Sequence, residues 1–314
     1  MEHSQLAEAL EERYGLAVQR LEPAPRGWTG ETYVATGREH GRVFVKLYRK
    51  GRVPPNAVAA LPVLAELRQR GIDQISRPIP SIRGSLHEPL GEDLLVLFEH
   101  IDGVLTEAFD REALGDLIAR VHEQTRHVKT PVARETFAPE HGAELVRILA
   151  EARDYAGKDE PRRGLKEYLE GNEDQVKRDW ESLRQVARGC RETRFELVLT
   201  HVDSLFNVMQ SGSGMIHLVD WDELLLAPAE RDTWFYTSQP AFWRGYHTRR
   251  PDHRERQLAT RFYAGVRYIE DLLGLAREIM GDGSAAHRAH RLSQLQGPWL
   301  PEVLRIFRGN AASG

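Results

Sequence analysis

Oxygen-bearing side chains gather in one short stretch of the sequence. Asp203 follows His201 by two residues, and Asn207 comes soon after. Asp220 ends the next apolar run. Carboxylate and amide oxygens suit hard, partly hydrated Mg²⁺, and a carboxylate beside an acceptor hydroxyl can receive its proton. Because these residues lie at the ends of expected short strands, one loop region could hold them around a cation and a phosphate-bearing ligand. The pattern indicates phosphoryl transfer.

The donor phosphates of such a reaction need a cation and an approachable backbone. Lys46 projects from the apolar run Val43-Phe-Val-Lys-Leu and could reach the phosphates. The segment Arg26-Gly-Trp-Thr-Gly-Glu-Thr is not a P-loop, but its backbone N–H groups could approach phosphates at Gly27, Thr29 and Gly30. A lone lysine in a strand is commonly a surface residue, and a Gly-x-x-Gly is commonly a hairpin turn. The order of the pieces along the chain is nevertheless the order that kinase-like folds use.

The elements that position these groups change in kind near residue 104. Before it we expect a helix from Gln5 to Tyr14 capped by Ser4, and a helix from about Asn56 to Arg70. Pro62 should kink the second helix and Gly71 should end it. Short β-rich runs separated by glycines predict the strands: Tyr33-Val-Ala-Thr, Arg42-Val-Phe-Val-Lys-Leu-Tyr and Asp93-Leu-Leu-Val-Leu-Phe-Glu.

After Asp102-Gly103 the periodicity becomes helical. The expected helices lie around 106–127, 139–155, 163–188, 252–279 and 285–308. The segment from Phe195 to Asp220 is the exception, since it reads as a β-hairpin. We therefore expect an α+β protein of two domains. Residues 1–103 would form a small β-rich nucleotide-binding lobe, and residues 104–314 a larger helical lobe with the catalytic and acceptor-binding groups.

Composition limits the classes of function. A chain of 314 residues with 41% hydrophobic and 29% charged content can bury a core in each of two lobes. Its net charge of −4 gives no basic field, so nucleic acid is not expected as a partner. The single Cys190 excludes an intramolecular disulfide and suits a reducing compartment. No apolar run approaches the roughly 20 residues that span a bilayer, and no secretory signal opens the chain, so we expect a cytoplasmic protein without membrane partners.

Nearly the whole chain resembles the aminoglycoside phosphotransferase and choline kinase-like family, the small-molecule branch of the protein-kinase-like fold. The resemblance is greatest to spectinomycin phosphotransferase-like enzymes. It rests on the following segments: Val219-Asp-Trp-Asp-Glu with its continuation Leu226-Ala-Pro-Ala-Glu-Arg-Asp-Thr-Trp-Phe, Arg70-Gly-Ile-Asp-Gln-Ile-Ser-Arg-Pro-Ile-Pro followed by Gly84-Ser-Leu, and Leu114-Gly-Asp-Leu-Ile-Ala-Arg-Val-His.

The resemblance implies a bilobal protein-kinase-like fold with ATP and Mg²⁺ as cofactors. By that resemblance Asp203 is the catalytic carboxylate, and Lys46 holds the donor phosphates. Asn207 and Asp220 would be the metal ligands. The segment Phe98-Glu99-His100-Ile101 would be the hinge, where backbone groups of Glu99 and Ile101 meet the adenine.

Two positions depart from the family pattern. The loop from Asp203 to Asn207 is one residue shorter than usual, with Leu205 where the family has a histidine. The small-lobe helix of the family carries a glutamate that pairs with the lysine, yet here that region reads Ala57-Val-Ala-Ala. Glu66, further along, is the nearest carboxylate in this helix. A displaced metal ligand or a loosely held Lys46 would impair transfer.

Recognition of the acceptor is expected just after the metal ligand. Trp221, Asp222 and Glu223 are the candidate contacts, and acidic groups among aromatic rings would suit a cationic, hydroxyl-rich acceptor. The plainer alternative is that most aromatic residues here belong to the core. Asp232 would then tie a helix to the catalytic loop, and His201 would be a packed structural residue.

The leading hypothesis is a small-molecule kinase that transfers the ATP γ-phosphoryl group to a hydroxyl of an amine-bearing acceptor. Antibiotic inactivation and a biosynthetic step are equally compatible, and the pattern does not separate ATP from GTP or a monomer from a homodimer. The alternative is a catalytically impaired kinase-like protein that binds a nucleotide or another ligand. A plain interaction protein on a helical scaffold is the least favoured class, because it leaves the ordered polar residues unused.

Overall fold

The computed structural model describes residues 3–24, 30–38 and 41–309. The chain divides into two compact units. The first comprises Met1–Arg134, Leu197–Asp232 and Tyr236–His253, and the second Glu135–Glu196, Thr233–Phe235 and Arg254–Gly314. The division into lobes after residue 103 is drawn differently and stays a prediction. In the described part of the chain, no helix has the length and apolar character needed to cross a membrane.

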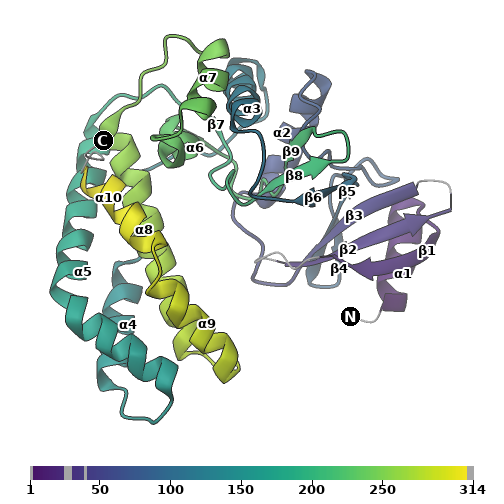
Figure 1. Ribbon diagram of the computed structural model, residues 1–314. Coiled ribbons are helices and arrows are strands. Elements are labelled where there is room, and N and C mark those ends of the chain that lie inside the picture. The colour runs from purple at the N-terminus through teal and green to yellow at the C-terminus, as the bar shows by residue number, and fades with distance from the viewer. Residues whose placement is uncertain (1–2, 25–29, 39–40, 310–314) are drawn as a thin grey trace. The chain divides into compact units, whose positions relative to one another are not determined.

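An antiparallel five-stranded sheet forms the N-terminal part of the first unit (Figure 1), with strand order β1-β2-β3-β5-β4. Its strands are β1 (Val18–Pro23), β2 (Gly30–Gly37), β3 (Gly41–Tyr48), β4 (Glu88–Leu90) and β5 (Asp93–Glu99). Alternate residues of a strand point to opposite faces. Val43, Val45 and Leu47 of β3 therefore join the core that α1 (His3–Tyr14) covers, while Lys46 lies on the other face. The three predicted strands are confirmed; β1 and β4 were not predicted.

The two predicted helices of this part are present with small differences. Helix α1 begins at His3, so Ser4 lies within its first turn and the prediction that it caps the helix was wrong. Helix α2 (Ala57–Gln69) begins after Asn56, as expected. Gly71 follows it at φ +84°, a left-handed conformation that glycine adopts without strain and that ends the helix.

The rest of the first unit contains two helices that cross closely and several short strands. In α3 (Arg111–Gln124) and α7 (Pro240–Arg249) the contact is made through glycine, because a Cβ on Gly245 would lie 1.9 Å from the Glu112 carbonyl oxygen. The predicted hairpin is present as β8 (Val208–Ser211) and β9 (Ile216–Leu218), and β6 (Gly103–Leu105) adds a third strand to it. Strands β7 (Val198–Thr200) and β10 (Leu225–Ala227) pair with each other, ahead of α6 (Glu230–Thr233).

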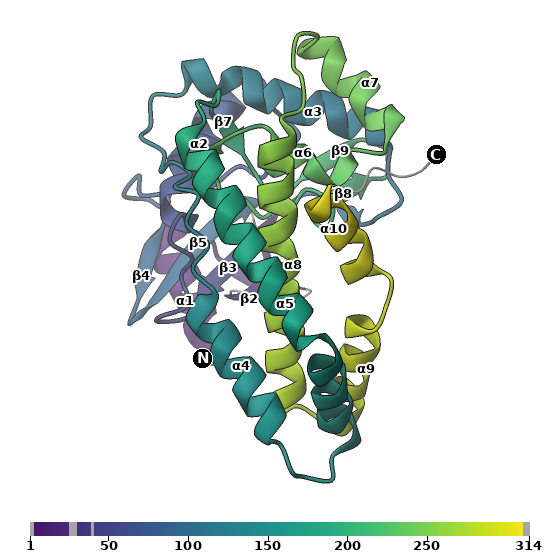
Figure 2. The ribbon, with the colours of Figure 1, turned by 90° about the vertical axis from the view of Figure 1, so that its left-hand side faces the viewer.

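The second unit is helical in its described residues (Figure 2). Its helices are α4 (Gly142–Asp154), α5 (Glu160–Glu192), α8 (Gln257–Met280), α9 (Ala285–Leu295) and α10 (Trp299–Arg308). The single helix predicted for 285–308 was wrong: Gly297 and Pro298 separate α9 from α10, because proline cannot donate a backbone hydrogen bond inside a helix. Helix α7 was not predicted either. The α+β class, a small antiparallel sheet followed by mainly helical chain, is confirmed.

Candidate active site

Lys46 is the centre of a buried group of charges on the face of the sheet opposite α1. Its Nζ donates to Asp220 Oδ1 at 2.7 Å and to Asp222 Oδ2 at 2.6 Å. The Lys46 side chain is only 6% exposed. Burial is the largest influence and would lower the pKa of Lys46, but the charges and hydrogen bonds of Asp220 and Asp222 raise that pKa on balance. Lys46 therefore stays a cation at the position expected for the donor phosphates.

Tyr48 completes this group from the same strand. It lies two residues after Lys46, so both side chains occupy one face of β3. The Tyr48 hydroxyl donates to Asp222 Oδ1 at 2.6 Å, and its ring centre lies 5.0 Å from Lys46 Nζ. Burial, and then the charge of Asp222, raise the pKa of Tyr48 far above its ordinary range. Tyr48 therefore remains a hydrogen-bond donor to Asp222.

The loop that carries Asp203 and Asn207 closes as a tight turn. Phe206 N donates to the Asp203 carbonyl at 3.3 Å, and Asn207 Nδ2 donates to the same oxygen at 3.1 Å. Val219 N donates to the Asn207 carbonyl at 3.0 Å. The turn is therefore closed by two hydrogen bonds to the Asp203 carbonyl, and Asn207 is hydrogen-bonded to the residue that precedes Asp220.

Asp220 and Val202 have left-handed backbones. Asp220 has φ +64° and Val202 has φ +85°, which is uncommon for any residue with a side chain and costly for a β-branched one. At Val202 the strain is offset by a 2.6 Å hydrogen bond from its N–H to Asp232 Oδ1. The sharp turn at Asp220 comes between β9 and Trp221, and the Asp220 side chain is 36% exposed. Strained backbone held in place by a buried partner is typical of functional sites.

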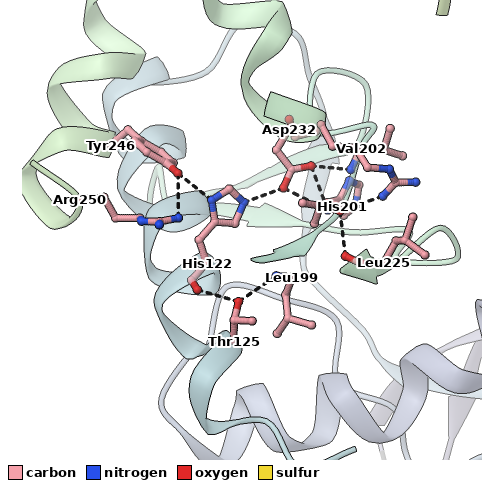
Figure 3. Close-up of polar contacts among 12 residues, drawn as sticks. His122, Thr125, Leu199, His201, Val202, Leu225, Asp232, Tyr246 and Arg250 are labelled. Carbon is pink, nitrogen blue, oxygen red and sulfur yellow. Dashed lines mark hydrogen bonds and ion pairs between the residues drawn. The ribbon is translucent and has the colours of Figure 1, made fainter. Parts of the chain in front are cut away.

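Asp232 is the buried partner that fixes the start of the Asp203 loop (Figure 3). Its carboxylate accepts from His201 N at 2.9 Å, from Val202 N at 2.6 Å and from His122 Nε2 at 3.0 Å. Burial would raise the pKa of Asp232, but the hydrogen bond and charge of His122 and the Val202 N–H hold it below its ordinary value. The expectation that Asp232 ties a helix to this loop is confirmed, since His122 lies in α3.

His201 is a structural residue, as the plainer alternative predicted. It is 1% exposed, and its ring meets the Trp221 ring edge to face at 4.6 Å. Its Nε2 lies 2.7 Å from the Val219 carbonyl oxygen, and its Nδ1 accepts from Asp203 N at 3.1 Å. A carbonyl can only accept, so Nε2 carries the proton and Nδ1 does not. His201 thus joins the Asp203 loop to the strand before Asp220.

Two of the three candidate acceptor contacts have other partners. Trp221 is 3% exposed and donates its indole N–H to the Leu218 carbonyl at 2.9 Å, so it belongs to the interior. Asp222 is buried, and its two oxygens are bonded to Lys46 and Tyr48. The contact of Trp221 and Asp222 with an acceptor therefore stays a prediction. Glu223 is exposed, and its contact with an acceptor stays a prediction.

The nucleotide-binding candidates are placed in part. Gly27 and Thr29 lie outside the described residues. Gly30 pairs with Tyr48 across β2 and β3, where a Cβ would lie 2.7 Å from the Leu47 carbonyl oxygen. A glycine is therefore required there for strand packing alone. In the same pairing, Thr32 lies opposite Lys46. Gly30 is therefore only two residues away from the β2 residue that faces Lys46 across the sheet.

The two hinge candidates, Glu99 and Ile101, differ in their hydrogen bonds within the protein. The Glu99 N–H already donates to the Arg77 carbonyl at 2.9 Å. The Glu99 carboxylate is bonded to Arg68 and Arg77. The contact of Glu99 with adenine stays a prediction. Ile101 follows β5 and is partly buried, so its contact with adenine stays a prediction.

Glu66 does not pair with Lys46. Its carboxylate accepts from Lys129 N at 2.8 Å, from Thr130 N at 2.9 Å and from Thr130 Oγ1 at 2.5 Å. These bonds attach α2 to the segment after α3. Glu66, the nearest carboxylate in this helix, therefore holds α2 to the segment after α3 and does not pair with Lys46.

The described part of the chain also has a hollow of about 490 Å³ that lies away from Lys46. Tyr14, Leu16 and Val43 line it. These residues belong to the core that α1 covers, whereas Lys46 lies on the opposite face of the sheet. Glu99 and His100 of the candidate hinge also line this hollow, so it extends to the end of β5.

The residues present fit a magnesium ion bound together with phosphates. The bond from Asn207 Nδ2 to the Asp203 carbonyl leaves Oδ1 as the atom that can face a cation. Asp220 is partly exposed and has a second carboxylate oxygen beyond the one bonded to Lys46. Mg²⁺ commonly takes one or two protein oxygens and completes its shell with water and phosphate. Among the described residues, no three His, Cys, Asp or Glu side chains gather into a metal centre.

Sequence reasoning missed Tyr48. Its position was visible in the alternation of β3, since Lys46-x-Tyr48 places two polar groups on one face of an apolar strand. Its partner Asp222 lies far away along the chain, and no spacing rule predicts that contact.

Comparisons with known proteins identify the family and the fold. A sequence profile described as "Phosphotransferase enzyme family" matches residues 20–269. A search of curated proteins finds no match. Among solved structures, the AMP-bound complex of a spectinomycin phosphotransferase has a TM-score of 0.77 at 19% identity, covering 99% of this chain and 99% of that one.

Two further structures are similar over almost their full length. Spectinomycin phosphotransferase in complex with ADP and spectinomycin gives a TM-score of 0.74 at 19% identity, with 98% of this chain and 94% of that chain covered. A microcompartment-associated aminopropanol kinase gives a TM-score of 0.62 at 17% identity, with 98% of each chain covered. At these identities the likeness establishes the fold, and the predicted protein-kinase-like fold is confirmed.

Proposed function

Because this chain belongs to the phosphotransferase enzyme family, we propose that it transfers the γ-phosphoryl group of ATP to a hydroxyl of a small amine-bearing molecule. The observation that carries the proposal is the cluster in which Lys46 lies 2.7 Å from Asp220. Asp220 is in turn connected through Val219 to Asn207 and the Asp203 loop. A cation, two oxygen ligands and a further carboxylate are the parts that phosphoryl transfer requires.

Lys46 would bind the donor phosphates. An ammonium group has three N–H donors, and two of these point to Asp220 and Asp222. The third can meet a phosphate oxygen, and the flanking carboxylates keep the group charged. Bound ATP with Mg²⁺ would supply the phosphoryl group and the charge neutralisation, held by Asn207 Oδ1 and Asp220.

Asp203 would act on the acceptor. Its backbone is fixed by His201 and Asn207, so its carboxylate is held by a rigid turn. In the reaction, the acceptor oxygen forms a bond to the γ-phosphorus, the bond from phosphorus to the ADP oxygen breaks, and Asp203 receives the hydroxyl proton. Positioning and charge, rather than covalent chemistry by the protein, carry such reactions.

The acceptor class is proposed from charge and from the similar structures. Glu223 is an exposed carboxylate close to Asp220 in the sequence, and it could attract an ammonium group. The similar structures are of enzymes named for spectinomycin and aminopropanol, which are both amine-bearing alcohols. Inactivation of an antibiotic and a biosynthetic step are both compatible with such an acceptor.

A transfer assay with a panel of amine-bearing alcohols tests the proposal. With radiolabelled ATP and Mg²⁺, we expect label on at least one acceptor. Asp203→Asn should lower kcat by about a thousandfold or more, since it removes the proton acceptor while leaving nucleotide affinity within about twofold. A wild-type protein that binds ATP but transfers label to no acceptor would favour the alternative, a kinase-like binding protein. That alternative is motivated by the shortened loop and by the absence of a Lys46 partner in α2.

A further inference from the structure

We propose that Asp222, held by Tyr48, is a positioning residue for Lys46 and takes the place of the helix carboxylate that is missing from α2. The inference rests on the proposed function, because Lys46 needs positioning only if it binds the donor phosphates. It also gives Asp222 a role different from acceptor recognition.

The geometry of Asp222 is that of a bridge between two side chains of one strand. Its Oδ2 accepts from Lys46 Nζ at 2.6 Å and its Oδ1 accepts from the Tyr48 hydroxyl at 2.6 Å. Lys46 and Tyr48 lie on the same face of β3, and the Tyr48 ring also contacts the ammonium group from 5.0 Å. Both oxygens of Asp222 are therefore engaged, and the carboxylate cannot rotate away without losing a charge-assisted bond.

Helix α2 offers no competing partner for Lys46. Glu66 is the sole carboxylate in Ala57–Gln69, and its oxygens are bonded to Lys129 and Thr130. The part of α2 where a partner would be expected is filled by buried residues such as Ala60, Leu61 and Leu64. A lysine without a partner in such an apolar setting would be costly, because an isolated buried charge is strongly unfavourable.

In this proposal Asp220 binds the metal and Asp222 positions Lys46. Asp220 has a side chain that is 36% exposed, whereas that of Asp222 is 12% exposed. The more exposed carboxylate can turn toward a cation and weaken its bond to Lys46. Asp222, which is more buried and bonded to Tyr48, keeps Lys46 in place while Asp220 binds the cation.

ADP and adenosine differ only in the phosphates, so a comparison of their affinities measures how well Lys46 is positioned to bind phosphate. Titration calorimetry with ADP and with adenosine, each with Mg²⁺ and with a chelator, separates phosphate binding from base binding. In Asp222→Asn the amide oxygen can still accept from Lys46 while the N–H₂ turns to the Tyr48 hydroxyl oxygen, but the negative charge that holds the ammonium group is lost. We expect this variant to lose about tenfold or more in ADP affinity in both conditions, while adenosine affinity stays within about twofold.

Two comparison variants sharpen the result. Glu66→Gln changes the carboxylate of α2 and should leave the ratio of ADP to adenosine affinity unchanged. The double variant with Lys46→Ala and Asp222→Asn should bind ADP no more weakly than Lys46→Ala alone, because Asp222 acts only through Lys46.

Tyr48→Phe keeps the test decisive if Asp222→Asn does not fold. It removes one hydroxyl and keeps the ring, so we expect a loss of about three- to tenfold in ADP affinity with adenosine affinity unchanged. Equal losses for ADP and adenosine would overturn the inference, as would a loss confined to the Mg²⁺ condition, which would make Asp222 a metal ligand. If the wild-type protein binds adenosine and ADP equally, the proposed function itself fails.

Discussion

At the scale of single residues, the site depends on charges that are buried only because they are paired. Lys46 and Asp222 form one such pair, with the partly exposed Asp220 as a second partner of Lys46. Asp232 is the other buried charge, held by hydrogen bonds from His201 N, Val202 N and His122. Removing one member of a buried pair leaves the other without a counter-charge, at a cost of about 3–5 kcal/mol. Both groups lie beside the segments that carry Asp203 and Asp220, so the same bonds that stabilise the fold also fix the candidate catalytic loop.

Asp232 makes a testable contribution to stability at low pH. Its folded-state pKa lies below the ordinary value of 3.8, because hydrogen bonds to the ionised form outweigh burial. A depressed pKa stabilises the fold above the unfolded-state pKa, and that stabilisation is lost as pH falls through the folded-state pKa. Asp232→Asn should lower stability by about 3 kcal/mol at pH 7, with a smaller difference from wild type below about pH 3.

Chemical denaturation of both proteins at several pH values measures this difference. Asp252→Asn, an exposed substitution at the start of the 252–256 segment, is a suitable control and should change stability by no more than about 0.5 kcal/mol. A difference between Asp232→Asn and wild type that stays constant from pH 7 to pH 3 would show that ionisation of Asp232 does not contribute.

Sequence reasoning identified residues better than it identified their partners. Lys46, Asp203 and Asp220 stood out by type and order, and Asp232 as part of the segment Glu-Arg-Asp. Trp221 and Asp222 were assigned to an acceptor because acidic groups among aromatic rings follow Asp220, but both residues are buried. Burial and long-range pairing depend on the tertiary fold, which local spacing does not encode.

At the scale of elements, close backbone approach at glycine controls how α3 meets α7. A Cβ on Gly245 would lie 1.9 Å from the Glu112 carbonyl oxygen, and one on Gly115 would lie 2.1 Å from the Phe242 carbonyl oxygen. Neither backbone can yield without separating the helices. His122 on α3 and Tyr246 on α7 are bonded across this crossing at 2.8 Å, so its geometry bears on Asp232 as well.

Gly245→Ala should therefore destabilise the protein by about 3 kcal/mol or more, beyond any gain from helix propensity. Gly274→Ala in α8 is the matched control, since nothing lies within 4 Å of the Cβ it would gain. That control should be neutral or stabilising by up to about 1 kcal/mol. Thermal melts of the two variants compare them directly, and equal melting temperatures would mean that the crossing is looser than described.

The elements themselves were predictable where periodicity was strong. Strands β2, β3 and β5 followed from apolar runs between glycines, and α5 and α8 from long helical periods. The break between α9 and α10 was missed because the apolar period continues across Gly297-Pro298. Helix α7 was missed because its aromatic and basic residues give a weak helical pattern, and its stability comes from packing on α3.

At the scale of the whole molecule, every described residue of the candidate site belongs to the first compact unit. Binding of Mg²⁺-ATP should therefore slow amide hydrogen exchange in β3 and in the segment 201–222. Exchange in α9 and α10 of the second unit should be unaffected by the nucleotide alone. Mass spectrometry of exchanged peptides measures both regions in one experiment. Protection found only in α9 and α10 would place the nucleotide outside the proposed site.

The central claim is that Lys46, Asn207 and Asp220 gather around one nucleotide and one magnesium ion, with Asp203 facing the acceptor. A crystal structure with Mg²⁺ and a non-hydrolysable ATP analogue tests it most directly. We expect Asn207 Oδ1 and a carboxylate oxygen of Asp220 on the metal, and Lys46 bonded to both a phosphate oxygen and Asp222. A nucleotide bound elsewhere, or a metal that touches neither Asn207 nor Asp220, would contradict it.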